Sequence, residues 1–83
     1  MIHANDTYTI MIFEILEKKA YDIINAFADR DIHVEIRKMA DNIRYNGTCT
    51  MTISNVHEVT MTPFMIWFLH HVDNGDYYKL VIS

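Results

Sequence analysis

Residues Thr7–Leu16, TYTIMIFEIL, constrain the fold more than any other stretch of the chain. The run is rich in β-branched and aromatic residues, which is typical of a β-strand. Successive side chains of a strand point to opposite faces, and here both faces are apolar. Such a strand belongs in the middle of a sheet, where both of its faces need cover. One face carries Tyr8, Ile10 and Ile12, and the other carries Met11, Phe13 and Ile15.

Two segments have the pattern of a helix. Apolar residues recur at helical spacing over 17–30, which predicts an amphipathic helix with a charged outer face. A second helix is predicted over 63–73, because the Thr62 hydroxyl can cap a free backbone N–H and Pro63 suits the first helical position. Asn74-Gly75 then supplies a stop signal for this helix.

The segment between these helices has the pattern of a long β-hairpin. Alternating apolar residues predict strands over 32–45 and 48–61, joined at Asn46-Gly47, which suits a two-residue type I′ turn. This turn pairs Val34 with Val59, so that the apolar faces of the two strands match.

An alternative starts the second helix at Asn55 and uses Asn55-x-x-Glu58 as a capping box. It places Pro63 in the helix interior, which costs about 3 kcal/mol. We therefore prefer the long hairpin, whose tip should project beyond the rest of the domain.

A last strand is predicted over 76–82, which completes the order β-α-β-β-α-β. This order is the split βαβ, or ferredoxin-like, arrangement in a single α+β domain with a four-stranded antiparallel sheet. Right-handed crossovers put both helices on one face of the sheet and the first strand in a central position. We expect the open face to carry Met11, Phe13 and Ile15, and to be covered by self-association as a homodimer.

The second helix is apolar on both sides. At about 100° per residue, Ile66, Trp67 and His70 fall opposite the side that should face the core. Either Ile66 and Trp67 cover the end of the helical layer, or they form a partner-facing patch, since tryptophan is enriched in interface hot spots. The side expected to face the core carries Met61, Phe64, Met65, Phe68, Leu69 and Val72.

The composition excludes several classes of function. Eighty-three residues, of which 51% are hydrophobic, suit one folded domain. A formal net charge of −4 argues against a phosphate-binding face, so we expect no nucleic-acid partner. No run approaches the roughly 18 apolar residues of a membrane span, and Met1–Thr7 does not resemble a signal peptide. The single Cys49 favours the cytoplasm over an oxidising compartment.

No catalytic, metal or cofactor site is predicted. The adjacent His70 and His71 point about 100° apart on a helix, and the remaining histidines are scattered. Cys49 has no patterned His or Asp neighbour, and the acidic residues are spread singly. Gly47 and Gly75 are both explained by turns, so no phosphate-binding loop is present. We expect a protein that is not an enzyme.

Two families share this order of elements. RNA-recognition domains stack bases on aromatic residues of their central strands, whereas residues 48–54 contain none and the chain lacks a basic surround. The stretch from Tyr8 to Lys38 resembles the first half of a regulatory domain of the ACT kind. That resemblance implies a small ligand or nucleotide bound at a dimer seam. Glu17-Lys18-Lys19 departs from the Gly-containing ligand loop that the ACT family carries after its first strand.

The leading hypothesis is a small protein-protein interaction domain. A short, acidic chain without catalytic motifs suits a stoichiometric inhibitor or regulator of a larger protein, such as those that phages encode against host or defence proteins. We expect the partner to contact Ile66, Trp67 and His70, together with Arg44 and Tyr45 at the hairpin tip. An ACT-like ligand-binding module is the alternative.

Overall fold

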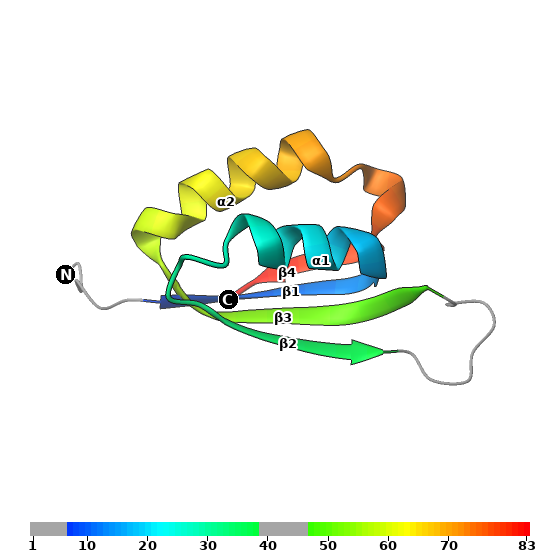
Figure 1. The fold of residues 1–83 in the computed structure, drawn as a ribbon, viewed down its shortest axis with the longest axis horizontal. Coiled ribbons are helices and arrows are strands. Elements are labelled where there is room, and N and C mark those ends of the chain that lie inside the picture. The colour runs from blue at the N-terminus through cyan, green and yellow to red at the C-terminus, as the bar shows by residue number, and fades with distance from the viewer. Residues whose placement is uncertain (1–6, 39–46) are drawn as a thin grey trace.

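The structure is a computed structural model that describes residues 7–38 and 47–83. Its elements follow the predicted order β-α-β-β-α-β, with one short 3-10 turn before the last strand (Figure 1). The described helices include none that is long and apolar enough to cross a membrane. The elements are β1 (Thr7–Leu16), α1 (Glu17–Ala26), β2 (His33–Lys38), β3 (Thr48–His57), α2 (Glu58–His71), η2 (Asn74–Asp76) and β4 (Lys79–Ile82).

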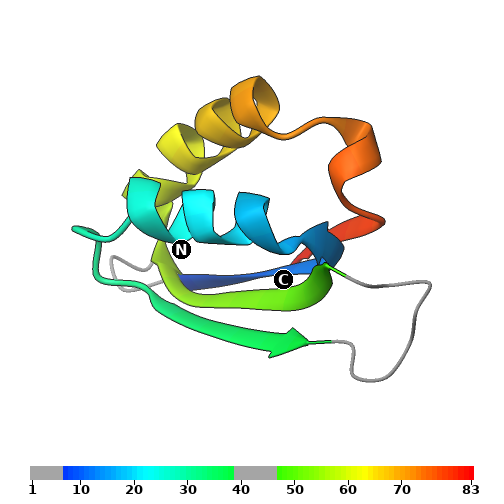
Figure 2. The same cartoon turned by 45° about the vertical axis from the view of Figure 1, so that its right-hand side comes forward.

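The four strands form one antiparallel sheet in the order β2-β3-β1-β4. β1 therefore occupies a central position, as its two apolar faces predict. Both helices lie over the same face of the sheet, and no described element covers the other face (Figures 1 and 2). These features confirm the ferredoxin-like α+β fold.

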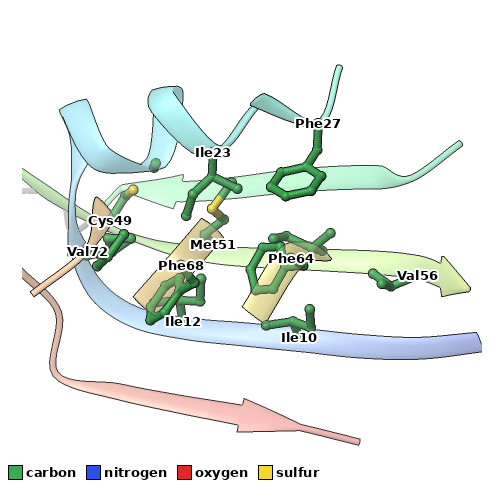
Figure 3. Close-up of a cluster of buried hydrophobic side chains, with 13 residues drawn as sticks. Ile10, Ile12, Ile23, Phe27, Cys49, Met51, Val56, Phe64, Phe68 and Val72 are labelled. Atoms are coloured by element: carbon green, nitrogen blue, oxygen red, sulfur yellow. The ribbon is translucent and has the colours of Figure 1, made fainter. Parts of the chain in front are cut away.

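The core lies between the sheet and the two helices (Figure 3). Phe27, next to the end of α1, packs against Phe64 of α2 with ring centres 5.4 Å apart. Aromatic side chains from the two helices therefore close the core above the sheet. The other buried apolar residues are Ile10, Ile12, Ile15, Ala20, Ile23, Cys49, Met51, Ile53, Val56, Phe68 and Val72.

A β-bulge at Glu14 interrupts β1. The pairing with β3 advances three residues along β1, from Ile12 to Ile15, while β3 advances only two. Glu14 takes up the extra residue with a φ of 52°, in the left-handed region. Because of this extra residue, Ile15 turns to the same face as Ile12 and is fully buried. The prediction that Ile15 lies on the open face is therefore wrong.

The pairing of β2 with β3 differs from the predicted register. Val34 lies opposite Ile53 rather than Val59, and the same offset holds over the whole of β2. The difference is six residues, an even number, so every side chain of β2 keeps its predicted face. Val34 and Ile36 accordingly pack against the core. The predicted turn at Asn46 and the strand residues 39–45 lie outside the described residues.

Asn55 marks the end of the β2–β3 pairing. Its φ is 60°, a conformation that asparagine tolerates better than most residues, and its Nδ2 donates to the Asp31 carbonyl oxygen at 2.7 Å. The last β2–β3 pair, His33 with Ser54, directly precedes it. The sequence pattern predicted that this strand ends at Met61, but β3 ends at His57.

α2 begins at Glu58, so the assignment of residues 58–61 to a strand is wrong. Pro63 lies inside the helix, as the rejected alternative had it, although the helix starts three residues after the position that the alternative proposed. The proline removes one helical hydrogen bond. The first turn of α2, however, buries Thr60 one turn before Phe64, and this packing against the sheet offsets the local cost.

Lys19 of α1 joins the end of α2 to η2. Its Nζ donates to the His71 carbonyl oxygen at 2.7 Å and lies 3.8 Å from Asp76 Oδ2. Carbonyl groups in the last turn of a helix have no intrahelical partner, and a cation there is favourable. The ammonium group therefore fixes the position of α2 relative to α1.

Candidate interaction surfaces

An apolar stripe runs along the solvent side of α2. Three of its large side chains are unusually exposed: Val59 is 80% exposed, Ile66 54% and Leu69 74%. Pro63 lies between Val59 and Ile66 on the same side of the helix, and His70 follows Leu69. Val59, Pro63, Ile66 and His70 have the i, i+4, i+7 and i+11 spacing of one helical face. We call these five residues the outer stripe of α2.

The sequence identified only part of this stripe. It placed Ile66 and His70 correctly on the exposed side, but it assigned Leu69 to the core side, and Leu69 is in fact exposed. Val59 was missed because it was assigned to a strand. The core side of α2 takes the narrower arc that contains Thr60, Phe64 and Phe68, so Leu69 falls beyond its edge.

Trp67 lies at the boundary between the core and the outer stripe. Its ring meets Phe27 edge-on, with centres 6.0 Å apart, and stacks on His71 with centres 4.4 Å apart. The side chain is half-buried. Trp67 therefore covers the end of the helical layer, as one of the two interpretations predicted, while part of its side chain stays exposed.

A shallow, mostly apolar hollow of about 470 Å³ lies beside Trp67. The rings of two histidines line it, and each is held by its own helix: His70 Nδ1 lies 2.7 Å from the Ile66 carbonyl oxygen, and His71 Nδ1 lies 2.9 Å from the Trp67 carbonyl oxygen. A carbonyl oxygen only accepts, so each Nδ1 carries the hydrogen. The hollow thus offers fixed rings to a docked side chain. Pro63 also lines it.

The open sheet face presents the opposite surface of the molecule. Met11 and Phe13 lie on it and are partly exposed, whereas the third residue predicted there, Ile15, is in the core. Strand pairing aligns the side chains of this face in two neighbouring rows. The first row is Glu35, Thr52, Met11 and Val81. The second row consists of the pairs Arg37–Thr50 and Phe13–Lys79, and the bulge of β1 interrupts the pairing between Thr50 and Phe13.

A second hollow, of about 510 Å³, lies over the β2 side of these rows. Its lining combines a carboxylate, a guanidinium, two hydroxyl groups and a thioether. The open face is therefore more polar at the β2 edge than the apolar pattern of β1 predicts, with its apolar part confined to the middle of the sheet. The lining residues are Met11, Glu35, Ile36, Arg37, Thr50 and Thr52.

Cys49 is fully buried under α1. Burial raises the pKa of its thiol, the carboxylate of Glu17 raises it further, and the ammonium of Lys38 lowers it. Glu17 and Lys38 pair with each other, with Nζ and Oε2 3.5 Å apart. A buried, protonated thiol is a poor nucleophile, so Cys49 acts as a small core residue.

No group of three or more His, Cys, Asp or Glu side chains comes together over residues 7–38 and 47–83 in a way that could hold a metal ion. Arg44 and Tyr45, which were predicted to contact a partner, lie outside the described residues. No protein-family model matches the chain, and no curated protein matches it either.

Proposed function

We propose that this chain is a protein-protein interaction domain that binds a larger protein through the outer stripe of α2. The observation that carries the proposal is the exposure of Val59, Ile66 and Leu69 on one face of one helix. Full burial of these three side chains contributes on the order of 3–6 kcal/mol, which corresponds to roughly two to four decades of affinity.

The spacing of the outer stripe suggests the shape of the partner site. Val59, Pro63, Ile66 and His70 recur at the spacing with which a helix enters an apolar groove. Acidic Glu58 and Asp73 flank the stripe and are both exposed. A groove with basic groups near its two ends would complement this arrangement.

A domain that acts by occupying a site on its partner is a stoichiometric inhibitor or regulator, of the kind that phages encode against host or defence proteins. Its small size and net charge of −4 are compatible with capture by a basic surface of a larger protein. A lone, fully buried thiol at Cys49 is suited to the reducing cytoplasm.

The test compares Ile66→Ser with the control Lys18→Ser, a change at an exposed position on α1. Proteins retained by the tagged wild-type chain from a lysate of its source cells are identified, and the binding of each purified candidate is then titrated. We expect Ile66→Ser to weaken one specific complex about tenfold or more with little change in melting temperature, while Lys18→Ser binds as the wild type does. Equal binding by both variants would contradict the proposal.

The ACT-like alternative receives less support. β1 ends at Leu16 and α1 begins at Glu17, so no loop separates them. A ligand site of the ACT kind would need such a loop. Within residues 7–38 and 47–83, the polar hollow beside Glu35 and Arg37 is the feature that favours a small ligand.

A further inference from the structure

The open sheet face carries opposite charges on its edge strand. Glu35 and Arg37 point to this face, because the alternate residues Val34 and Ile36 pack against the core. Both charged side chains are exposed. Within the described ranges, the Glu35 carboxylate pairs with the ring of His33, with Nε2 and Oε1 3.3 Å apart, and Arg37 forms no ion pair. The two charges therefore face solvent in an arrangement that a second molecule can complement.

We propose that a second copy of this chain covers the open face, around a two-fold axis that crosses the strands between the first and second rows. This rotation keeps each strand over its counterpart and reverses its direction, so the first row of one copy lies over the second row of the other. Glu35 then faces Arg37 of the second copy, and the same pair forms again on the other side of the axis. A two-fold interface requires this kind of self-complementarity.

The same operation matches the remaining side chains of the two rows. Met11 of one copy lies over Phe13 of the other, which removes the most apolar part of the open face from water. Lys79 lies over Val81, where its aliphatic stem covers an apolar side chain while the ammonium group stays at the rim. Apolar side chains therefore meet in the middle, and charged groups lie at the edges, as in protein interfaces generally.

The size of the face sets the expected strength of the dimer. Strands of 10, 6, 10 and 4 residues, each residue covering about 3.3 Å by 4.8 Å of sheet, give roughly 480 Å² per copy. Two such faces bury on the order of 1,000 Å², which is at the lower limit for a specific interface. We therefore expect a dimer that dissociates on dilution. α2 lies on the far side of the sheet, so this pairing is independent of the proposed partner site.

Two other occupants would also use the charges of β2. Antiparallel pairing of two β2 edges about Ile36 would place Glu35 across from Arg37 of a second copy as well, but it would leave Met11 and Phe13 in solvent. A small zwitterion in the hollow could bridge the carboxylate and the guanidinium within one copy. The experiment therefore needs a variant that affects the middle of the sheet.

The test measures molar mass by sedimentation equilibrium up to about 1 mM chain, where weak complexes assemble. We expect Glu35→Arg and Arg37→Glu each to raise the dimer dissociation constant roughly tenfold to a hundredfold, because like charges then meet twice. An equimolar mixture of the two variants should recover an affinity close to that of the wild type, since each arginine then meets a glutamate. Asp22→Arg, on the exposed side of α1, is the control and should dimerise normally.

Phe13→Lys distinguishes face pairing from edge pairing. Face pairing predicts a monomer for this variant, with circular dichroism unchanged because Phe13 is outside the core cluster. A folded Phe13→Lys that still dimerises would show edge pairing and overturn the proposal. A wild-type chain that stays monomeric would also overturn it, and saturable glycine binding to that monomer would assign the charges to a small ligand instead.

Discussion

Replacing Glu14 with glycine and with valine should change the stability of the fold in opposite directions. A residue with a Cβ in the left-handed region costs about 1–2 kcal/mol relative to glycine. Glycine loses roughly 0.5–1 kcal/mol of this gain through its greater freedom in the unfolded chain, so Glu14→Gly should stabilise by about 0.5–1 kcal/mol. A β-branched side chain fits this region worse than glutamate does, so Glu14→Val should destabilise by about 1 kcal/mol or more.

The expected gap between the two variants is thus about 2 kcal/mol, or roughly 8–16 °C in melting temperature for a domain of this size. Urea unfolding followed by far-ultraviolet circular dichroism measures it directly. Glu35 provides a matched control, since it is an exposed strand residue without a positive φ. There valine should be at least as stable as glycine. If Glu14→Val is more stable than Glu14→Gly, the conclusion that a bulge at Glu14 turns Ile15 into the core is refuted.

Two further predictions concern Lys19, which joins α1 to the end of α2, and the buried thiol of Cys49. Lys19→Met should lower the free energy of unfolding by about 1–2 kcal/mol in urea titrations, because the His71 carbonyl loses a charged donor, whereas Lys18→Met should have little effect. An equal loss in both variants would contradict this role of Lys19. For Cys49, the pKa of the folded thiol lies above its ordinary value of 9.0, so the unfolded chain loses the proton first. Stability should therefore fall as the pH rises above 9.0, by up to about 1.4 kcal/mol per pH unit. Cys49→Ala should lack this component, and identical slopes for the two proteins would refute it.

Local patterns predicted the parts of the fold that depend on side-chain period. β1 has the predicted bounds, because ten residues with two apolar faces have no other stable location than the middle of a sheet. The faces of β2, and of β3 as far as Ser54, were also predicted correctly, although their register was wrong. Val56 was predicted on the threonine side of β3 but is buried in the core, because the pairing with β1 shifts register beside Asn55. Alternation reports which side a residue faces, and any even shift in register leaves that side unchanged.

The candidate surfaces could be predicted only in part. Ile66 and His70 follow from the helical spacing, but Val59 belongs to the outer stripe only because α2 starts at Glu58. Whether Leu69 faces the core depends on how α2 rotates against the sheet. That rotation is set by the contacts of Phe27 with Phe64 and Trp67. Phe27 is distant from both residues in sequence, so local spacing does not reveal these contacts.

By itself, the sequence determined the order of the elements, the central position of β1 and the alternation of faces along β2, since these follow from local period and turn residues. Tertiary structure decided where β3 gives way to α2, which residues pair across β2 and β3, and how Ile15 enters the core. In each case a local preference was overruled. Burial of Thr60 and Phe64 outweighs the cost of Pro63 in a helix, and burial of Ile15 outweighs the strained backbone of Glu14.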